Sequence, residues 1–252
     1  MAANFTNDYL LDKQVKIFQP IDGYRASSDA VLLSAMPDDD LKNARILDVG
    51  SGTGAVSLCL AHRLQKNNVQ IIGLELQKEL AELSVQSAVA NDFDFVEFYQ
   101  VDIRQKLNIP EYSPCSFDVV ISNPPYSEHD MPSPNLSKST AHNHRDFDLT
   151  HWLAFCLKSL KPFGRLYLIN RAEALSDICS FLKGKAGNIT VLPIYSKKNQ
   201  TAKRIIISAQ KDSKAPCKIL PPLITHNSDG KYTEESEKIL RQGLSFETIR
   251  NI

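Results

Sequence analysis

The sequence predicts an α/β protein with a doubly wound sheet of seven mostly parallel strands, of which the last is antiparallel. Three observations lead to this fold class. From about residue 44 to residue 208, short runs rich in β-branched residues alternate with stretches of helical periodicity. A glycine-rich loop directly follows the first run. Near residue 200, two apolar runs are joined by a polar connector, which is typical of a final antiparallel hairpin.

The elements follow one another in a regular order. The predicted strands are short and apolar, and they cover residues 45–49, 69–74, 95–101, 117–121, 165–170, 189–194 and 204–208. Helices are predicted where small and apolar residues recur at helical spacing, at residues 54–65, 78–91, 149–160 and 172–184. The polar connector at residues 196–203 joins the last two strands, which makes the final strand antiparallel.

The chain divides into three predicted segments. Residues 44–210 form the sheet and are expected to be the catalytic domain, and residues 1–43 add a segment and a helix that close its ligand site. Residues 211–252 form a tail that packs on the domain or contacts a partner. The loop at residues 127–148 is long for a compact domain and is expected to be a substrate lid.

Composition limits the function classes. The chain has 252 residues, 42% hydrophobic and 23% charged, which is typical of one large globular domain. Its 29 Lys and Arg balance 29 Asp and Glu, so any site for a polyanion must be a local patch. Five cysteines without a Cys-x-x-Cys pair argue against disulfides and zinc. No apolar run could span a membrane, and we expect a cytoplasmic monomer or weak dimer without bound metal.

The turn after the fourth strand predicts chemistry on a planar nitrogen. It reads Ser122, Asn123, Pro124, Pro125 and Tyr126. An Asn side-chain oxygen and a proline carbonyl can accept the two hydrogens of an amine or amide whose lone pair must be re-aimed. The prolines make the turn stiff, and Tyr126 can stack on a base or amide. We predict that Asn123, Pro124, Pro125 and Tyr126 are catalytic; the alternative is a stiff turn with a packing Tyr.

The loop after the first strand predicts a site for S-adenosylmethionine. Asp48 closes the strand, and the loop then reads Gly50, Ser51, Gly52, Thr53 and Gly54. Alternate glycines let a ligand approach the main chain closely, but their spacing is shorter than in dinucleotide-binding loops. The Asp48 carboxylate would repel a pyrophosphate and attract an ammonium group. This favours the methionine half of S-adenosylmethionine over NAD; a plain β-to-α connection is the alternative.

Further polar residues follow the next strands. Glu75 ends the second strand, 27 residues after Asp48, where a ribose diol finds its acceptor. Asp102 ends the third strand and can accept from an adenine amino group. Asn123 follows the fourth strand and is expected to reach the cofactor as well as the substrate. Because ligands of open α/β sheets bind at the carboxyl edge, we assign Glu75 and Asp102 to cofactor binding, together with their neighbours Leu76 and Ile103.

These motifs carry a family resemblance. Residues 48–54 and 123–126 resemble the class I S-adenosylmethionine-dependent methyltransferases that methylate amino groups, and the resemblance covers residues 23–208. Residues 23–33 are similar to the N-terminal signature of the bacterial N6-adenine methyltransferases that act beside the anticodon of valine tRNA. The resemblance implies a Rossmann-like fold, S-adenosylmethionine as cofactor and tRNA as partner. It also implies that Tyr24 and Asp29 lie on the cofactor side, whereas the residues alone make Asp29 a helix cap.

Several basic residues are candidates for contact with RNA. His144 and Arg145 lie in the loop behind Tyr126, and Lys197 and Lys198 lie in the connector of the final hairpin. A wider basic set around the last strands and the site consists of Lys183, Lys185, Lys203, Arg204 and Arg171. The alternative is an ordinary solvated surface, in which His142 and His144 are plain loop residues.

Other functions are compatible with the same motifs. N2 of guanine in ribosomal RNA and the side-chain amide of a protein glutamine pose the same lone-pair problem. Only some 45 residues precede the glycine loop, which is short for the helical domain that glutamine methyltransferases add there, and this favours RNA. A catalytically silent module that binds RNA or a partner is a third alternative, but such a module would not need the intact turn and glycines.

Overall fold

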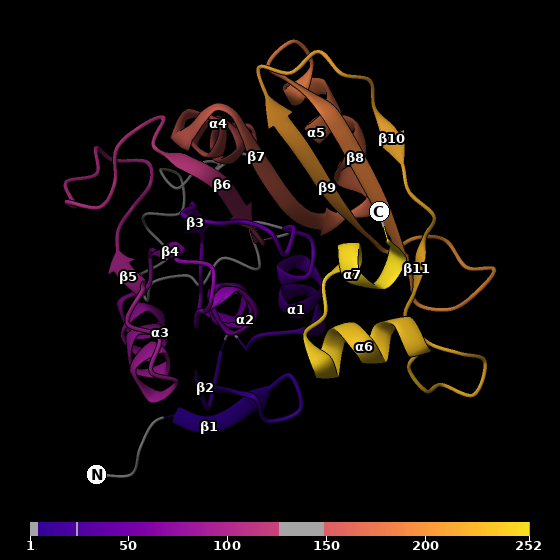
Figure 1. Ribbon diagram of the computed structural model, residues 1–252, viewed down its shortest axis with the longest axis horizontal. Helices are drawn as coiled ribbons and strands as arrows, with labels where there is room; N and C mark the ends of the chain where they lie inside the picture. Colours follow the sequence, from indigo (N-terminus) through magenta and orange to yellow (C-terminus); the bar gives the residue numbers. More distant parts are fainter. Residues whose placement is uncertain (1–4, 24, 126–148, 252) are drawn as a thin grey trace, which may run out of the picture.

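The computed structural model describes residues 5–23, 25–125 and 149–251. Within these residues the centre of the molecule is a nine-stranded mixed sheet in the order β10-β8-β9-β7-β6-β3-β4-β5, with β11 paired to β8 off this path (Figure 1). Tyr24, Tyr126, His144 and Arg145, as well as the predicted lid at residues 127–148, lie outside the described residues.

The seven long strands confirm the predicted fold class. They are β3 (Arg45–Val49), β4 (Gln70–Glu75), β5 (Val96–Gln100), β6 (Phe117–Ser122), β7 (Leu160–Arg171), β8 (Ala186–Tyr195) and β9 (Arg204–Lys211). Strands β5, β4, β3, β6 and β7 pair in parallel, and β9 is antiparallel to both β7 and β8. Two short strands that the sequence did not predict, β10 (Lys218–Ile219) and β11 (Leu223–Ile224), extend the sheet in parallel beside β8.

Helices cover both faces of the sheet. On one face lie α1 (Ser28–Ser34), α2 (Ala55–Leu64) and α3 (Lys78–Ala90); on the other lie α4 (Leu149–Ser159) and α5 (Leu175–Leu182), which follows the short 3₁₀ turn η2 (Ala172–Ala174) (Figure 1). Neighbouring strand residues pack into opposite layers: Ile46 belongs to the first layer and Leu47 to the second. Since both faces are buried, the strands are nearly continuous apolar runs, as is usual for parallel sheets.

An N-terminal hairpin, β1 (Phe5–Leu10) and β2 (Val15–Pro20), was not predicted from the sequence. An isolated two-stranded hairpin is only marginally stable in water, and this one is held against α3 by side-chain hydrogen bonds. Ser87 Oγ accepts from the Phe18 amide at 2.9 Å, and Asn91 Oδ1 accepts from the Lys16 amide at 2.8 Å. Asn91 Nδ2 also donates to the Lys16 carbonyl. Val15 and Ile17 of β2 are fully buried in the apolar layer that contains α1 and α2, so the hairpin is held by both polar and apolar contacts.

The C-terminal tail packs on the sheet domain. After β10 and β11 it forms α6 (Glu234–Gln242) and α7 (Phe246–Arg250). Thr233 caps α6 by accepting from the Ser236 amide, and Gly243 ends the helix in the left-handed conformation, with φ of 69°. Ile239 and Phe246 are buried in the layer that contains α1 and α2. The amphipathic stretch at residues 234–242 thus covers the sheet domain.

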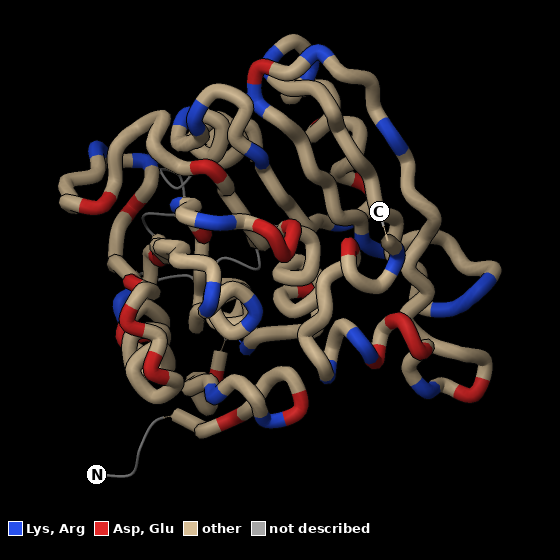
Figure 2. Tube along the Cα trace, viewed as in Figure 1, with Lys and Arg blue, Asp and Glu red and all other residues tan. Residues whose placement is uncertain are grey.

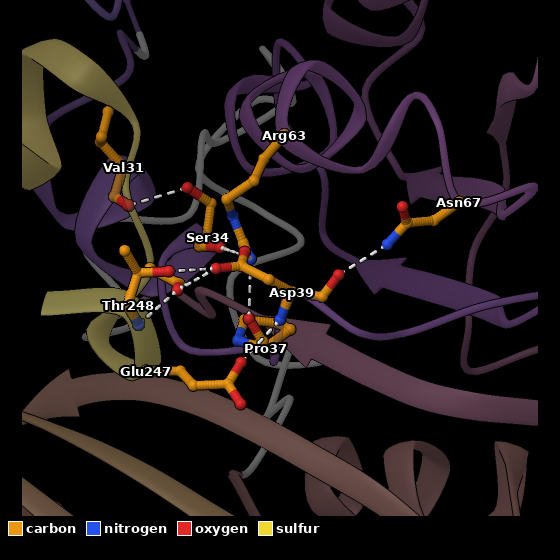
Figure 3. A network of polar contacts seen from close by, with 9 residues as sticks. Val31, Ser34, Pro37, Asp39, Arg63, Asn67, Glu247 and Thr248 are labelled. Atoms are coloured by element: carbon orange, nitrogen blue, oxygen red, sulfur yellow. Dashed lines mark hydrogen bonds and ion pairs between the residues drawn. The ribbon is translucent and has the colours of Figure 1, made fainter. Parts of the chain in front are cut away.

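Asp39 anchors the end of this tail (Figure 3). Its carboxylate accepts from Ser245 Oγ at 2.5 Å and Thr248 Oγ1 at 2.6 Å, and it pairs with Arg63. Its amide donates to Glu247 Oε2 at 2.9 Å. Burial acts to raise the pKa of Asp39, but the hydrogen bonds from Ser245, Thr248 and Arg63 outweigh it and hold the pKa below its usual value.

We expect Asp39→Ala to lower the free energy of unfolding by about 2 kcal/mol, because several hydrogen bonds to one charged group are lost. Urea denaturation at pH 7 measures this, with Asp40→Ala at the neighbouring exposed position as the control. A group whose pKa is lowered by folding stabilises above its unfolded pKa, so the difference between wild type and Asp39→Ala should shrink below about pH 4. Equal stability of the two variants at pH 7 would contradict this role.

Candidate functional site

The predicted polar residues form a row along the carboxyl edge of four adjacent strands. The strands lie in the order β5-β4-β3-β6, so that Asp102, Glu75, Asp48 and Asn123 succeed one another across the sheet. Val49 pairs with Leu74 on one side and with Ser122 on the other. The sheet changes its direction of winding between β3 and β6, which is the place where open α/β sheets bind ligands.

The glycine loop is fixed to the neighbouring strand by its backbone. The amides of Gly50 and Ser51 both donate to the Leu74 carbonyl, at 2.8 and 3.0 Å. Gly50 has φ of 74°, and a Cβ there would lie 2.7 Å from the Trp152 ring. Gly54 caps α2 with φ of 85°. The loop therefore requires glycine for its conformation and for its contact with Trp152.

The Asp48 carboxyl is fully buried behind this loop. Its Oδ2 atom accepts from Ser57 Oγ at 2.7 Å. Burial raises the pKa of Asp48 to about 7; the hydrogen bonds from Ser57 act against this shift, and the charge of Glu75 adds to it. We expected Asp48 to present a carboxylate to an ammonium group. That role stays a prediction: in the structure this carboxyl is fully buried, its pKa is raised by burial, and β3 continues one residue beyond it to Val49.

Three buried polar atoms around the loop have no hydrogen-bond partner within the described part of the chain: Asp48 Oδ1, Ser51 Oγ and Thr53 Oγ1. Buried polar groups are nearly always hydrogen-bonded, so a cluster of three without partners requires an explanation. They lie at the switch point of the sheet, where a bound ligand could supply such partners.

Glu75 lies at the end of β4 and is 7% exposed. Its two oxygens accept from the Gly52 and Gln77 amides, both at 2.8 Å. Burial raises its pKa, and hydrogen bonds from the amides of Gln77, Gly52 and Leu76 partly offset the rise. The carboxylate is thereby held against the glycine loop, and each oxygen keeps a further lone pair for a diol. The neighbouring Leu76 side chain is exposed beside it.

Asp102 lies two residues beyond the end of β5. It forms an ion pair with Arg104, whose Nε and Nη2 atoms lie 2.8 and 2.7 Å from the carboxylate. This hydrogen bonding lowers the pKa of Asp102, while burial acts against the shift. The carboxylate is therefore charged and only partly available to an adenine amino group. Ile103 is partly buried against the layer that contains α4.

The start of the turn after β6 is fixed by a hydrogen bond from Trp152 of α4. Ser122 Oγ donates to the Val49 carbonyl at 2.7 Å and accepts from Trp152 Nε1 at 2.8 Å. These bonds fix the end of β6 against β3. Asn123 follows half-buried, and Pro124 is buried while Pro125 is exposed. Sequence reasoning missed Trp152; its signal was the only tryptophan of the chain, in the first turn of the helix that follows the long loop.

Asp29 lies at the same edge but is already paired. Arg204 Nε donates to its Oδ2 atom at 3.0 Å, and Ser27 caps α1 next to it. Arg204 begins β9, and in the antiparallel register of the sheet it lies opposite Arg171 at the end of β7. The ion pair of Asp29 with Arg204 ties α1 to the sheet, and the cofactor-side role that the resemblance implies for Asp29 stays a prediction.

The candidate basic residues lie at two separate places, and their contact with RNA stays a prediction. Lys183 and Lys185 precede β8, whereas Lys197, Lys198 and Lys203 follow it. A strand of ten residues spans about 33 Å, so the two groups lie at opposite edges of the sheet. Only the second group shares the edge of Asn123.

Among the described residues, no helix is long and apolar enough to cross a membrane. No group of three or more His, Cys, Asp or Glu among them is arranged to hold a metal ion.

Residues 40–222 match a family described as a methyltransferase domain. A curated protein of Actinobacillus pleuropneumoniae serotype 5b, named tRNA1(Val) (adenine(37)-N6)-methyltransferase, is 28% identical over 223 residues, which cover 86% of this chain and 89% of that protein. A protein of the same name from Porphyromonas gingivalis strain W83 is 31% identical over 170 residues, 66% of each chain.

A solved structure has the same fold. It is described as a predicted O-methyltransferase from Agrobacterium tumefaciens and superposes with a TM-score of 0.70 over 86% of this chain and 97% of that one. At 23% sequence identity, this similarity concerns the fold alone.

We expect the stability of the protein to fall as the pH rises from about 4 to about 8, and Asp48→Asn to remove most of this dependence. A carboxyl whose pKa is raised by folding stabilises while it is protonated, and this stabilisation is lost as the pH passes the folded value of about 7. Asn can still accept from Ser57. The measurement is thermal unfolding at a series of pH values, with the exposed Asp22→Asn as control. Parallel curves for wild type and Asp48→Asn would show that Asp48 does not titrate in this range.

Proposed function

The chain belongs to the class I S-adenosylmethionine-dependent methyltransferases, and on this premise we propose that it methylates N6 of an adenine in tRNA. The observation that carries the proposal is the position of Asn123 and Pro124. They follow β6 next to the loop that follows β3, since Ser122 and Val49 pair in register. The relatives named tRNA1(Val) (adenine(37)-N6)-methyltransferase support adenine in tRNA as the substrate. A tRNA substrate in turn favours the cytoplasm as the place of action.

The residues at the switch point fit S-adenosylmethionine. This cofactor carries a methyl group on a positively charged sulfur atom, from which a nitrogen lone pair can take it. Ser51 Oγ and Thr53 Oγ1 are buried hydroxyls without a partner among the described residues, and they are suited to the polar methionine end. Glu75 is suited to the ribose diol, and Asp102 with Leu76 and Ile103 to the adenine. These assignments follow the row of strands from β3 to β5.

The chain's own groups would act by positioning. The Asn123 side-chain oxygen and the Pro124 carbonyl would accept the two N6 hydrogens, which holds the amine and directs its lone pair. These hydrogen bonds strengthen as the nitrogen gains positive charge, so they stabilise the transition state more than the ground state. Ser122 and Trp152 hold the turn in place beneath Asn123. Tyr126 is assigned to stacking on the base. The proton that leaves the nitrogen can pass to water.

The first experiment supplies the purified chain with methyl-labelled S-adenosylmethionine and total tRNA, ribosomal RNA or protein. We expect label in tRNA, released as N6-methyladenosine on nucleoside digestion. Label in N2-methylguanosine of ribosomal RNA, or in protein glutamine, would replace the adenine proposal by one of these alternatives. Binding of RNA without any transfer would favour a catalytically silent module.

A second experiment concerns Asn123. We expect Asn123→Ala to lower kcat by about 100-fold or more, because one of the two acceptors that hold the amine is lost, while the Kd for S-adenosylmethionine changes by a few-fold at most. Single-turnover kinetics and calorimetric titration measure the two quantities. Asn108→Ala, in an exposed loop, is the matched control. A parallel loss of affinity and rate would mean that Asn123 mainly builds the cofactor pocket.

A further inference from the structure

The carboxyl edge that carries Asn123 continues beyond β6. The next strands are β7, β9 and β8. Arg171 ends β7 and lies opposite Arg204 of β9 in the sheet register. On its other side, Arg204 lies opposite Ile194, near the end of β8. Three strand spacings separate β6 from β8, or about 14 Å. The loop after β8 therefore lies on the same edge as Asn123, two or three nucleotide lengths away.

This loop is basic. Residues 196–203 read Ser-Lys-Lys-Asn-Gln-Thr-Ala-Lys and contain no carboxylate. Lys197, Lys198 and Lys203 are exposed, and none of them forms an ion pair with a described residue. Arg171 is exposed between them and Asn123. Figure 2 shows the loop as basic positions on the right of the view, beside the tail.

The C-terminal tail is hydrogen-bonded to the same loop. The Thr225 amide donates to the Tyr195 carbonyl at 2.8 Å, and the His226 amide donates to the Ser196 carbonyl at 3.0 Å. His226 also forms a β-bridge with Tyr232, and their rings lie 4.7 Å apart. Both rings are partly exposed. An aromatic pair, with its ring planes tilted by 33°, is thus fixed directly beside the segment that carries Lys197 and Lys198.

The carboxylates of the tail do not neutralise these lysines. Asp229 pairs with Lys231 at 3.9 Å, Glu234 pairs with Lys238 at 2.8 Å, and Glu235 pairs with Arg250. Each tail carboxylate near the loop is therefore matched by a cation of the tail. The positive charge of the β8–β9 loop remains uncompensated within the described residues, although the whole chain has no net charge.

We propose that the RNA strand next to the target adenine runs along this edge and is held by Lys197, Lys198 and Lys203, with a base stacked on the His226–Tyr232 pair. Exposed lysine ammonium groups suit the phosphates of an RNA strand, and flat rings beside them suit an unpaired base. An acidic protein would use the cations but would leave the aromatic pair without a role. The proposal rests on the proposed function for the choice of RNA and extends it to a tail that the methyl transfer itself does not need.

The test compares two double variants with the same loss of charge. Lys197→Ala/Lys198→Ala removes the proposed contacts, and Lys183→Ala/Lys214→Ala removes two exposed lysines at the opposite edge, near the start of β8. Fluorescence anisotropy with labelled tRNA gives the Kd at several salt concentrations. We expect the first pair to weaken binding about ten-fold and to reduce the slope of log K against log salt by about 1.4, and the control pair to match wild type.

Tyr232 gives an independent readout. Tyr232→Ala should weaken tRNA binding about five-fold or more, whereas Tyr232→Phe, which keeps the ring, should bind as wild type does. All four variants should bind S-adenosylmethionine with the wild-type Kd. Equal tRNA affinities and salt slopes for the two lysine pairs would overturn the proposed surface.

Methyl transfer by the wild type, measured in parallel, separates the two proposals. Transfer to tRNA with no difference between the lysine pairs would overturn the surface and leave the function standing. A difference between the pairs without transfer to any RNA would support the surface and overturn the function. Transfer to protein, with no affinity for tRNA, would overturn both.

Discussion

The candidate site depends on the parallel register of β3 between β4 and β6. Val49 pairs with Leu74 and Ser122, and this places the ends of three strands at one level. The glycine loop then bonds to the Leu74 carbonyl, and Ser122 bonds to the Val49 carbonyl. A slip of one residue would turn every side chain of β3 to the opposite face. Because both faces carry their own apolar layer, such a slip would be costly, and the site is as well defined as the core.

Burial determines the chemistry of the acidic residues at this edge. Asp48 and Glu75 both have raised pKa values, and burial is the main cause for each. Their environments still differ. Backbone amides donate to both oxygens of Glu75 and stabilise its charged form. Asp48 accepts from the Ser57 hydroxyl with one oxygen, and its other oxygen has no partner among the described residues. The pKa of Asp102 is lowered instead, because Arg104 donates hydrogen bonds to its carboxylate. Three carboxyls that look alike in the sequence therefore have three different electrostatic roles.

The outer segments are attached by buried apolar residues together with directional polar contacts: Val15 and Ile17 of the hairpin and Ile239 and Phe246 of the tail belong to the apolar layer of α1 and α2. The hairpin is also hydrogen-bonded to Ser87 of α3 and to its C-cap Asn91, and the end of the tail is hydrogen-bonded to Asp39. Such bonds are directional, so each segment has one defined position. The tail reaches the β8–β9 loop through the amides of Thr225 and His226. The tail thus contacts two parts of the molecule: Phe246 packs in the layer of α1 and α2, and residues 225 and 226 bond to the basic β8–β9 loop.

The sequence alone determined the fold class, the order of the strands from β3 to β9 and the edge at which the candidate residues lie, because apolar periodicity and glycine spacing are local properties. Only the tertiary structure decided which charges meet. Asp29 pairs with a residue 175 positions away, and Lys183 and Lys197 lie at opposite ends of β8 although they are close in sequence. The hairpin of β1 and β2 depends on partners in α3 that no local pattern announces. Long-range pairs form where the packed elements bring side chains together, and their identity follows from that packing rather than from local propensity.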